Sequence, residues 1–167
     1  GMLFNAEIVE SVATMMKKTN PGNIVLDPVM ISKSGDNLLR RDCVDVLRSL
    51  LIPLATIVTP NIPEAEELTG IQVLDKRSME KAAHYILDMG AQSVIMKGGH
   101  MEGDPIDYFF DGENSIELVS KRIETKNTHG TGCTFSSAVA ANLALGKDLE
   151  ASTRIAQSYV HDSIDPG

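Results

Sequence analysis

Residues 55–70, ATIVTPNIPEAEELTG, place a short apolar strand directly before an acidic helix. The run from Thr56 to Thr59 is typical of a buried parallel strand, and Pro60 ends it because proline cannot donate to a β-ladder. Pro63 suits the first turn of a helix, and Gly70 suits its end. This stretch therefore predicts one strand–helix unit of an α/β protein.

The same alternation recurs on both sides of this unit. Apolar runs at 24–26 and 93–97 predict two further strands, and segments 106–110 and 116–119 predict a hairpin or an antiparallel edge. Helical periodicity and caps predict helices over 6–18 after Asn5, 42–51 from Asp42, 63–70, 78–90 from Ser78, 133–145 and 149–163. We therefore expect a three-layer α/β/α fold with a mostly parallel sheet.

Composition excludes several classes of function. The 167 residues carry 15 Lys and Arg against 23 Asp and Glu, a formal charge of −8. We expect no nucleic-acid or anionic-membrane partner, because either requires a basic face. No apolar run approaches the ~18 residues of a membrane span. Cys43 and Cys133 form no metal-ligand pair with the four histidines, and a cytoplasmic location is the expectation.

The most informative single motif is THGTGCT at residues 128–134, ahead of a helix of small residues. Two glycines around one residue let backbone N–H groups converge on an anion, and a helix N-terminus adds positive potential. Such a cradle would stabilise a transferring phosphoryl group. A tight turn with a helix cap is the alternative for an isolated Gly-Thr-Gly. A P-loop is excluded because its Gly-Lys must be followed by Ser or Thr, whereas Gly146-Lys147 is followed by Asp. A dinucleotide-binding motif is excluded because Phe135 stands where its third glycine is required.

Other polar residues follow the strand ends, where open α/β sheets bind ligands. Asp27 follows the first strand, and Asn61 and Glu64 lie three apart after the second, where they could share the hydration shell of one Mg²⁺. Lys97 follows the third strand and could meet phosphate as a point charge. Cys133 lies at a helix N-terminus, which makes it a candidate base or nucleophile. Ordinary loop solvation is the alternative for the residues at the strand ends. The general preference of helix N-termini for Glu is the alternative for Glu64, and a small, half-buried helix residue is the alternative for Cys133.

Five segments together resemble one family: GMLFN at 1–5, LDPVMISKSG at 26–35, VTPNIPEAEELTG at 58–70, MKGGH at 96–100 and NTHGTGCT at 127–134. In this order they are similar to the hydroxymethylpyrimidine/phosphomethylpyrimidine kinases of thiamine biosynthesis, which are ribokinase-like. The resemblance runs through residues 1–167 and implies one partial ribokinase-like kinase domain. It also implies two successive ATP- and Mg²⁺-dependent phosphorylations, of hydroxymethylpyrimidine and then of its monophosphate.

The resemblance implies site roles as well. Gly130, Thr131, Gly132 and Cys133 would form the anion hole. Sugar-kinase relatives carry an Asp base at the position of Cys133. A cysteine there is similar to the pyrimidine-kinase branch and argues against a sugar substrate.

The remaining implied roles concern metal, nucleotide and substrate. Asn61 and Glu64 would hold Mg²⁺ through water. Asp27, Lys97 and Thr128 would bind the nucleotide and its phosphates. Met2 and Val29 would line the pyrimidine pocket.

Members of this family are longer, so the resemblance implies a sheet that is incomplete at the N-terminus. Such a sheet exposes an edge and a face, and we expect a homo-oligomer or a missing N-terminal half to cover them. Three alternatives remain open. They are a pyridoxal or pyridoxine kinase of the same fold, a truncated remnant that binds nucleotide or a partner without turnover, and an unrelated α/β domain whose glycine-rich turn is only structural.

Overall fold

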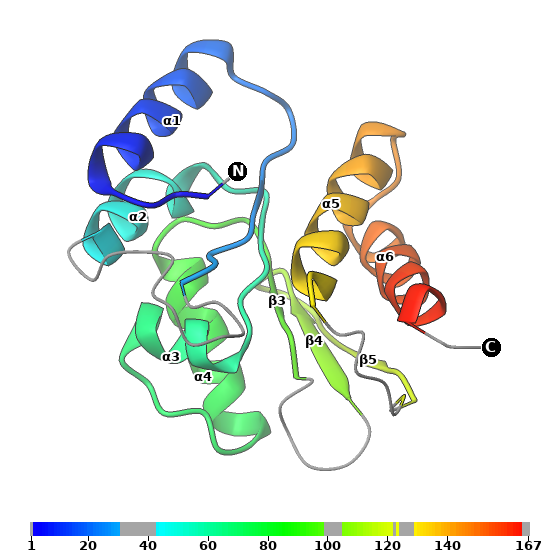
Figure 1. Ribbon diagram of the computed structural model, residues 1–167. Coiled ribbons are helices and arrows are strands. Elements are labelled where there is room, and N and C mark those ends of the chain that lie inside the picture. Colours follow the sequence, from blue (N-terminus) through cyan, green and yellow to red (C-terminus); the bar gives the residue numbers. More distant parts are fainter. Residues whose placement is uncertain (1, 31–42, 99–104, 122, 124–128, 165–167) are drawn as a thin grey trace.

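Figure 1 shows the computed structural model, which describes residues 2–30, 43–98, 105–121, 123 and 129–164. The helices are α1 (Ala6–Thr19), α2 (Val44–Leu50), the 3₁₀ helix η2 (Ile52–Leu54), α3 (Ile62–Thr69), α4 (Lys76–Asp88), α5 (Thr131–Ala144) and α6 (Leu149–Ile164). The strands are β1 (Val25–Leu26), β2 (Ile57–Val58), β3 (Val94–Met96), β4 (Ile106–Phe110) and β5 (Ser115–Val119).

The described strands form one mixed sheet in the order β1-β2-β3-β4-β5. The first three strands are parallel, with Val25 opposite Ile57 and Val58 opposite Val94. β4 pairs antiparallel with both β3 and β5, so the predicted hairpin is confirmed and it extends the sheet. The carboxyl ends of β1, β2 and β3 consequently lie at the same edge, where the sequence predicted a site.

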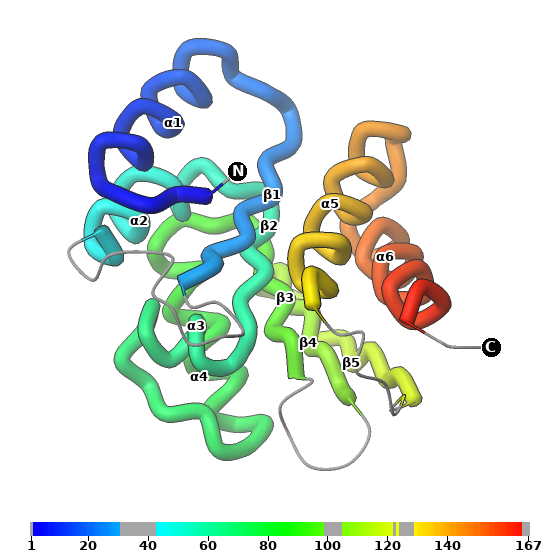
Figure 2. The backbone as a smooth tube through the Cα atoms, in the orientation of Figure 1, coloured from blue at the N-terminus to red at the C-terminus, as the bar shows by residue number. Residues whose placement is uncertain are grey.

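Helices cover both faces of this sheet (Figures 1 and 2). α1 to α4 lie over one face, where Val58 and Val94 belong to a buried cluster with residues of these helices. α5 and α6 lie over the other face, where Ile57 and Ile95 pack with Phe135 of α5. Because side chains of a strand alternate between faces, neighbouring residues of each strand supply the two cores. The predicted three-layer arrangement is confirmed.

Helix starts differ from the sequence prediction in four places, and the smallest difference is in α3, which begins at Ile62, one residue before the predicted start. α4 begins after Asp75, whose side chain accepts from the Ser78 backbone N–H, so Ser78 is the third helical residue and not the cap. α2 begins at Val44 with Cys43 at the N-cap, and the predicted cap Asp42 lies outside the described residues. α5 begins at Thr131, two residues earlier than predicted, which makes Gly132 part of its first turn.

The Asn5 cap of α1 is confirmed, since its side chain accepts from the Ile8 N–H over 2.9 Å. Within the described part of the chain, every helix is too short or too polar to cross a membrane.

Candidate functional site

The ends of the three parallel strands bring together Asp27, Thr59 and Lys97. Lys97 Nζ lies 3.1 Å from Asp27 Oδ1, and the Thr59 hydroxyl donates to the same oxygen over 3.2 Å. The Lys97 and Asp27 side chains are only 17% and 14% exposed. Since shielding from water strengthens the attraction between opposite charges, this ion pair holds the ammonium group in a defined place.

The first turn of α5 lies directly against this ion pair. A Cβ atom built on Gly132 would lie 3.3 Å from Lys97 Nζ, so the missing side chain allows the ammonium group to approach the helix backbone. Ser136, one turn further along α5, lies 2.9 Å from the Thr59 hydroxyl, and its own hydroxyl donates to the Gly132 carbonyl. The helix N-terminus is thereby fixed to the ends of β1, β2 and β3.

The start of α5 is a helix N-terminus with a glycine at its cap. Gly130 is the N-cap with φ 79°, a left-handed conformation that favours glycine. The first N–H groups of a helix have no acceptor within the helix, and the helix dipole makes that end positive. Gly130, Thr131, Gly132 and Cys133 are thus continuous at one helix start, next to a lysine ammonium group. Thr128 lies outside the described residues.

Asn61 and Glu64 form a reciprocal capping box at the start of α3. The Glu64 N–H donates to Asn61 Oδ1 over 2.9 Å, and the Asn61 N–H donates to Glu64 Oε2 over 2.8 Å. Glu64 is buried, and burial raises the pKa of its carboxyl group, while the nearby Lys97 ammonium opposes the rise. The structure thus joins these two residues through the backbone, and their role in holding Mg²⁺ stays a prediction.

The oxygen donors at this edge still suit Mg²⁺, which prefers carboxylate oxygens and retains water. The Asp27 carboxylate adds to the rise in the pKa of Glu64 that burial causes. However, no group of three or more His, Cys, Asp or Glu side chains that could hold a metal ion occurs among the described residues. Asn61 Oδ1 is engaged in the cap, and Mg²⁺ contact through retained water is compatible with that arrangement.

The two predicted substrate residues lie differently. The Val29 N–H donates to the carbonyl of Asp27 over 2.9 Å, which places Val29 at the carboxyl end of β1. Met2 is 54% exposed, close to the start of the chain. Their role in a pyrimidine pocket stays a prediction.

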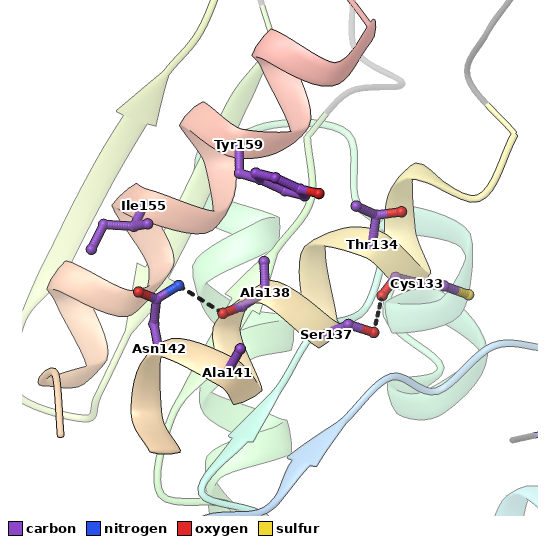
Figure 3. A pocket seen from close by; sticks show the side chains of 8 residues that line it. All are labelled: Cys133, Thr134, Ser137, Ala138, Ala141, Asn142, Ile155 and Tyr159. Atoms are coloured by element: carbon purple, nitrogen blue, oxygen red, sulfur yellow. Dashed lines mark hydrogen bonds between the residues drawn. The ribbon is translucent and has the colours of Figure 1, made fainter. Parts of the chain in front are cut away.

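Cys133 lies at one end of a groove of about 550 Å³ between α5 and α6. Figure 3 shows Thr134 and Ala138 pointing toward Tyr159 of α6, whereas the Cys133 sulfur points away from it. The thiol is exposed, and the Cys133 carbonyl accepts from the Ser137 hydroxyl over 2.7 Å. Cys133 is accessible at the helix start, and its role as base or anion-hole member stays a prediction.

Sequence reasoning missed two polar groups at this end of the sheet. For Ser136, the sequence signal is its position four residues after Gly132, which places it one helical turn beyond the glycine motif. Asp107 carries none, because it reads as one residue of an alternating strand. Its Oδ1 accepts from the Gly98 N–H over 2.9 Å, immediately after Lys97, and burial raises the pKa of its carboxyl group.

Comparison with known proteins agrees with the motifs. A family described as phosphomethylpyrimidine kinase matches residues 1–167. The chain is 47% identical to the thiamine biosynthesis bifunctional protein ThiED of Geobacter sulfurreducens, covering 98% of this chain and 34% of that protein. It is 41% identical to the hydroxymethylpyrimidine/phosphomethylpyrimidine kinase of Bacillus subtilis, covering 99% of this chain and 62% of that protein.

Solved structures agree with the fold. The chain is similar to the pyridoxal kinase of Staphylococcus aureus in complex with ADP, with a TM-score of 0.92 and 35% identity over 100% of this chain and 61% of that one. It is also similar to the phosphomethylpyrimidine kinase of Clostridium difficile, with a TM-score of 0.83 and 40% identity over 98% of this chain and 66% of that one. The chain thus spans 62% of the length of the B. subtilis relative and a smaller share of the bifunctional one.

Proposed function

The chain belongs to the phosphomethylpyrimidine kinase family, and from this premise we propose that it carries the phosphate-binding part of an ATP-dependent kinase of hydroxymethylpyrimidine and its monophosphate. The observation that carries the proposal is the Lys97 ammonium group held between Asp27 and the first turn of α5. A lysine and a helix N-terminus that face the same space form a site for an anion with several oxygens, such as a nucleotide phosphate.

Phosphoryl transfer depends mainly on positioning and on electrostatic stabilisation of charge on the equatorial oxygens. In the proposed site the N–H groups at Gly130–Cys133 stabilise that charge, and Lys97 adds a fixed positive charge beside them. Asp27 and Thr59 hold Lys97 in place. In the proposed mechanism, the exposed Cys133 accepts the proton of the substrate hydroxyl as the phosphoryl group arrives.

Mg²⁺ would bind through water at Asn61 and Glu64 and neutralise charge on the phosphates. The S. aureus pyridoxal kinase structures include complexes with ADP and with AMP-PCP, and this supports nucleotide binding in the present chain. The same neighbours make pyridoxal the second candidate substrate. The relatives named hydroxymethylpyrimidine/phosphomethylpyrimidine kinase, at 38% to 44% identity, favour the pyrimidine.

Assembly is part of the proposal. Among the described strands, β1 stands at the end of the sheet order and comprises only Val25 and Leu26. We propose that another copy or further sequence covers this edge, in a protein that acts in the cytoplasm. A light-scattering mass equal to one 167-residue chain at micromolar concentration would contradict association between copies.

The first experiment is a thermal-shift titration with a non-hydrolysable ATP analogue, with and without Mg²⁺, followed by assays of transfer to hydroxymethylpyrimidine and to pyridoxal. Ligand at 100 times Kd adds about 2.7 kcal/mol, which raises the melting temperature by roughly 5–10 °C at this size. The Lys97→Met variant should lose the shift, while the exposed Lys81→Met should keep it. The absence of any shift at millimolar analogue would contradict the proposal, whereas a shift without transfer to either substrate would favour the remnant without turnover.

A further inference from the structure

Asp107 fixes the backbone at the point where β3 leaves the sheet. The ladder between β3 and β4 ends at the pair Met96 and Tyr108. Beyond that pair, the Gly98 N–H donates to Asp107 Oδ1 over 2.9 Å, so a side-chain carboxylate serves as the next acceptor. On the other side, the Lys97 N–H donates to the Pro60 carbonyl over 2.9 Å. The backbone of Lys97 is thereby held from both neighbouring strands.

The carboxylate of Asp107 is itself held from α6. Gln157 Nε2 lies 3.3 Å from Asp107 Oδ2 and 2.9 Å from the Leu118 carbonyl of β5. One amide group therefore ties α6 to both strands of the hairpin. A carboxylate with two fixed donors has little freedom to turn, and it defines the position of the Gly98 N–H closely.

Gly98 allows the two strand ends to approach far more closely than another residue would. A Cβ atom at this position would lie 1.9 Å from the Ile106 carbonyl oxygen. The glycine and the Asp107 acceptor are thus two parts of one arrangement that sets where the chain leaves β3. Lys97 is the last residue before that point, and its ammonium group lies at the start of α5.

We propose that Asp107 is a positioning residue for phosphate binding, which acts by fixing the Lys97–Gly98 backbone and hence the place of the Lys97 ammonium group. This inference rests on the proposed function, because Lys97 matters here as a phosphate ligand. The charge of Asp107 opposes an incoming anion, so its contribution is geometric. The hydrogen-bond acceptor is therefore needed and the negative charge is not.

Two variants separate these properties. Asp107→Ala removes the acceptor, while Asp107→Asn keeps one carbonyl oxygen for the Gly98 N–H and removes the charge. Glu117→Gln removes an exposed carboxylate from the same hairpin and serves as the control. The measurements are ADP affinity by calorimetry, KM for ATP against kcat, and hydrogen exchange of the Gly98 amide by NMR.

We expect Asp107→Ala to weaken ADP binding about tenfold, the equivalent of one hydrogen bond to a charged group, with KM for ATP rising in proportion and the Gly98 amide exchanging faster. Asp107→Asn should stay within about threefold of the parent chain, and Glu117→Gln should match it.

Equal affinity for ADP in Asp107→Ala and the parent chain, with only a lower melting temperature, would show a purely structural role and overturn the inference. Equal losses in Asp107→Ala and Asp107→Asn would also overturn it, because an acceptor for the Gly98 N–H would then not be sufficient. A parent chain that binds no nucleotide would overturn the proposed function, and the inference with it. Since that outcome is read in the parent chain alone, the two failures are distinguishable.

Discussion

Replacing Gly98 with alanine should destabilise the chain strongly, because the new Cβ would lie 1.9 Å from the Ile106 carbonyl oxygen. Real Cβ contacts essentially never fall below 3.0 Å, so the ends of β3 and β4 must separate by at least the difference, about 1.1 Å. The atom in the way belongs to the backbone of β4, which cannot turn aside as a flexible side chain would. The Gly98 N–H bond to Asp107 would lengthen with the same movement.

The magnitude follows from these two effects. Overpacking typically costs 1–3 kcal/mol, and loss of a hydrogen bond to a charged group costs 1.5–3 kcal/mol. We therefore expect a loss of about 3–5 kcal/mol in the free energy of unfolding and a fall in melting temperature of about 10 °C.

The assay is urea unfolding followed by far-UV circular dichroism, since the chain contains no Trp. Gly22→Ala is the matched control, because nothing lies within 4 Å of its Cβ position, and it should change stability by less than about 1 kcal/mol. A Gly98→Ala midpoint within error of the parent chain would contradict this prediction. So would an equal loss in the two variants.

Three further predictions concern the site. Lys97→Met should lower the free energy of unfolding by about 2–3 kcal/mol in urea melts, because it leaves the mostly buried Asp27 carboxylate without its partner; a loss below about 0.5 kcal/mol would instead indicate a surface pair. Because burial raises the pKa of Glu64, the parent chain should lose stability as the pH rises from the ordinary Glu pKa of 4.5 toward the raised pKa. Glu64→Gln should therefore gain stability relative to the parent as the pH rises through this range in a series of urea melts, and a difference that does not change with pH would contradict this. Cys133→Ala should lower kcat at least about 100-fold with little change in KM for ATP if the thiol is the base, and near-normal kcat would exclude that role.

Much of the fold could be predicted from local patterns. Continuous apolar runs located β1, β2 and β3, and alternation located the hairpin of β4 and β5. Helix starts were harder, since Asp75 and Ser78 are both good capping residues and lie three apart. The hydrogen bonds in the structure, from each side chain to the backbone N–H of the other residue, show that Asp75 is the cap and Ser78 its partner.

The site was predictable at its strand ends and not beyond them. Asp27 and Lys97 could be predicted because ligands bind at the carboxyl ends of parallel strands. Their ion pair could not, because it depends on the order of the strands in the sheet. Ser136 and Asp107 escaped notice because their contacts come from packing between elements far apart in the chain. The metal assignment of Asn61 and Glu64 missed the local use of both side chains in the capping box.

The contacts that build the site join residues far apart in the sequence, and this has a kinetic consequence. Asp27 and Lys97 are 70 positions apart, and Thr59 and Ser136 are 77 apart. Closing such long loops is slow compared with forming a helix, and a chain emerging from the ribosome folds from its N-terminal end. The turn at the start of α5 therefore reaches the ends of β1, β2 and β3 only after Ser136 has been synthesised. A nascent chain that ends before α5 lacks the proposed phosphate-binding turn, so nucleotide binding during synthesis would report the docking of α5 on the sheet.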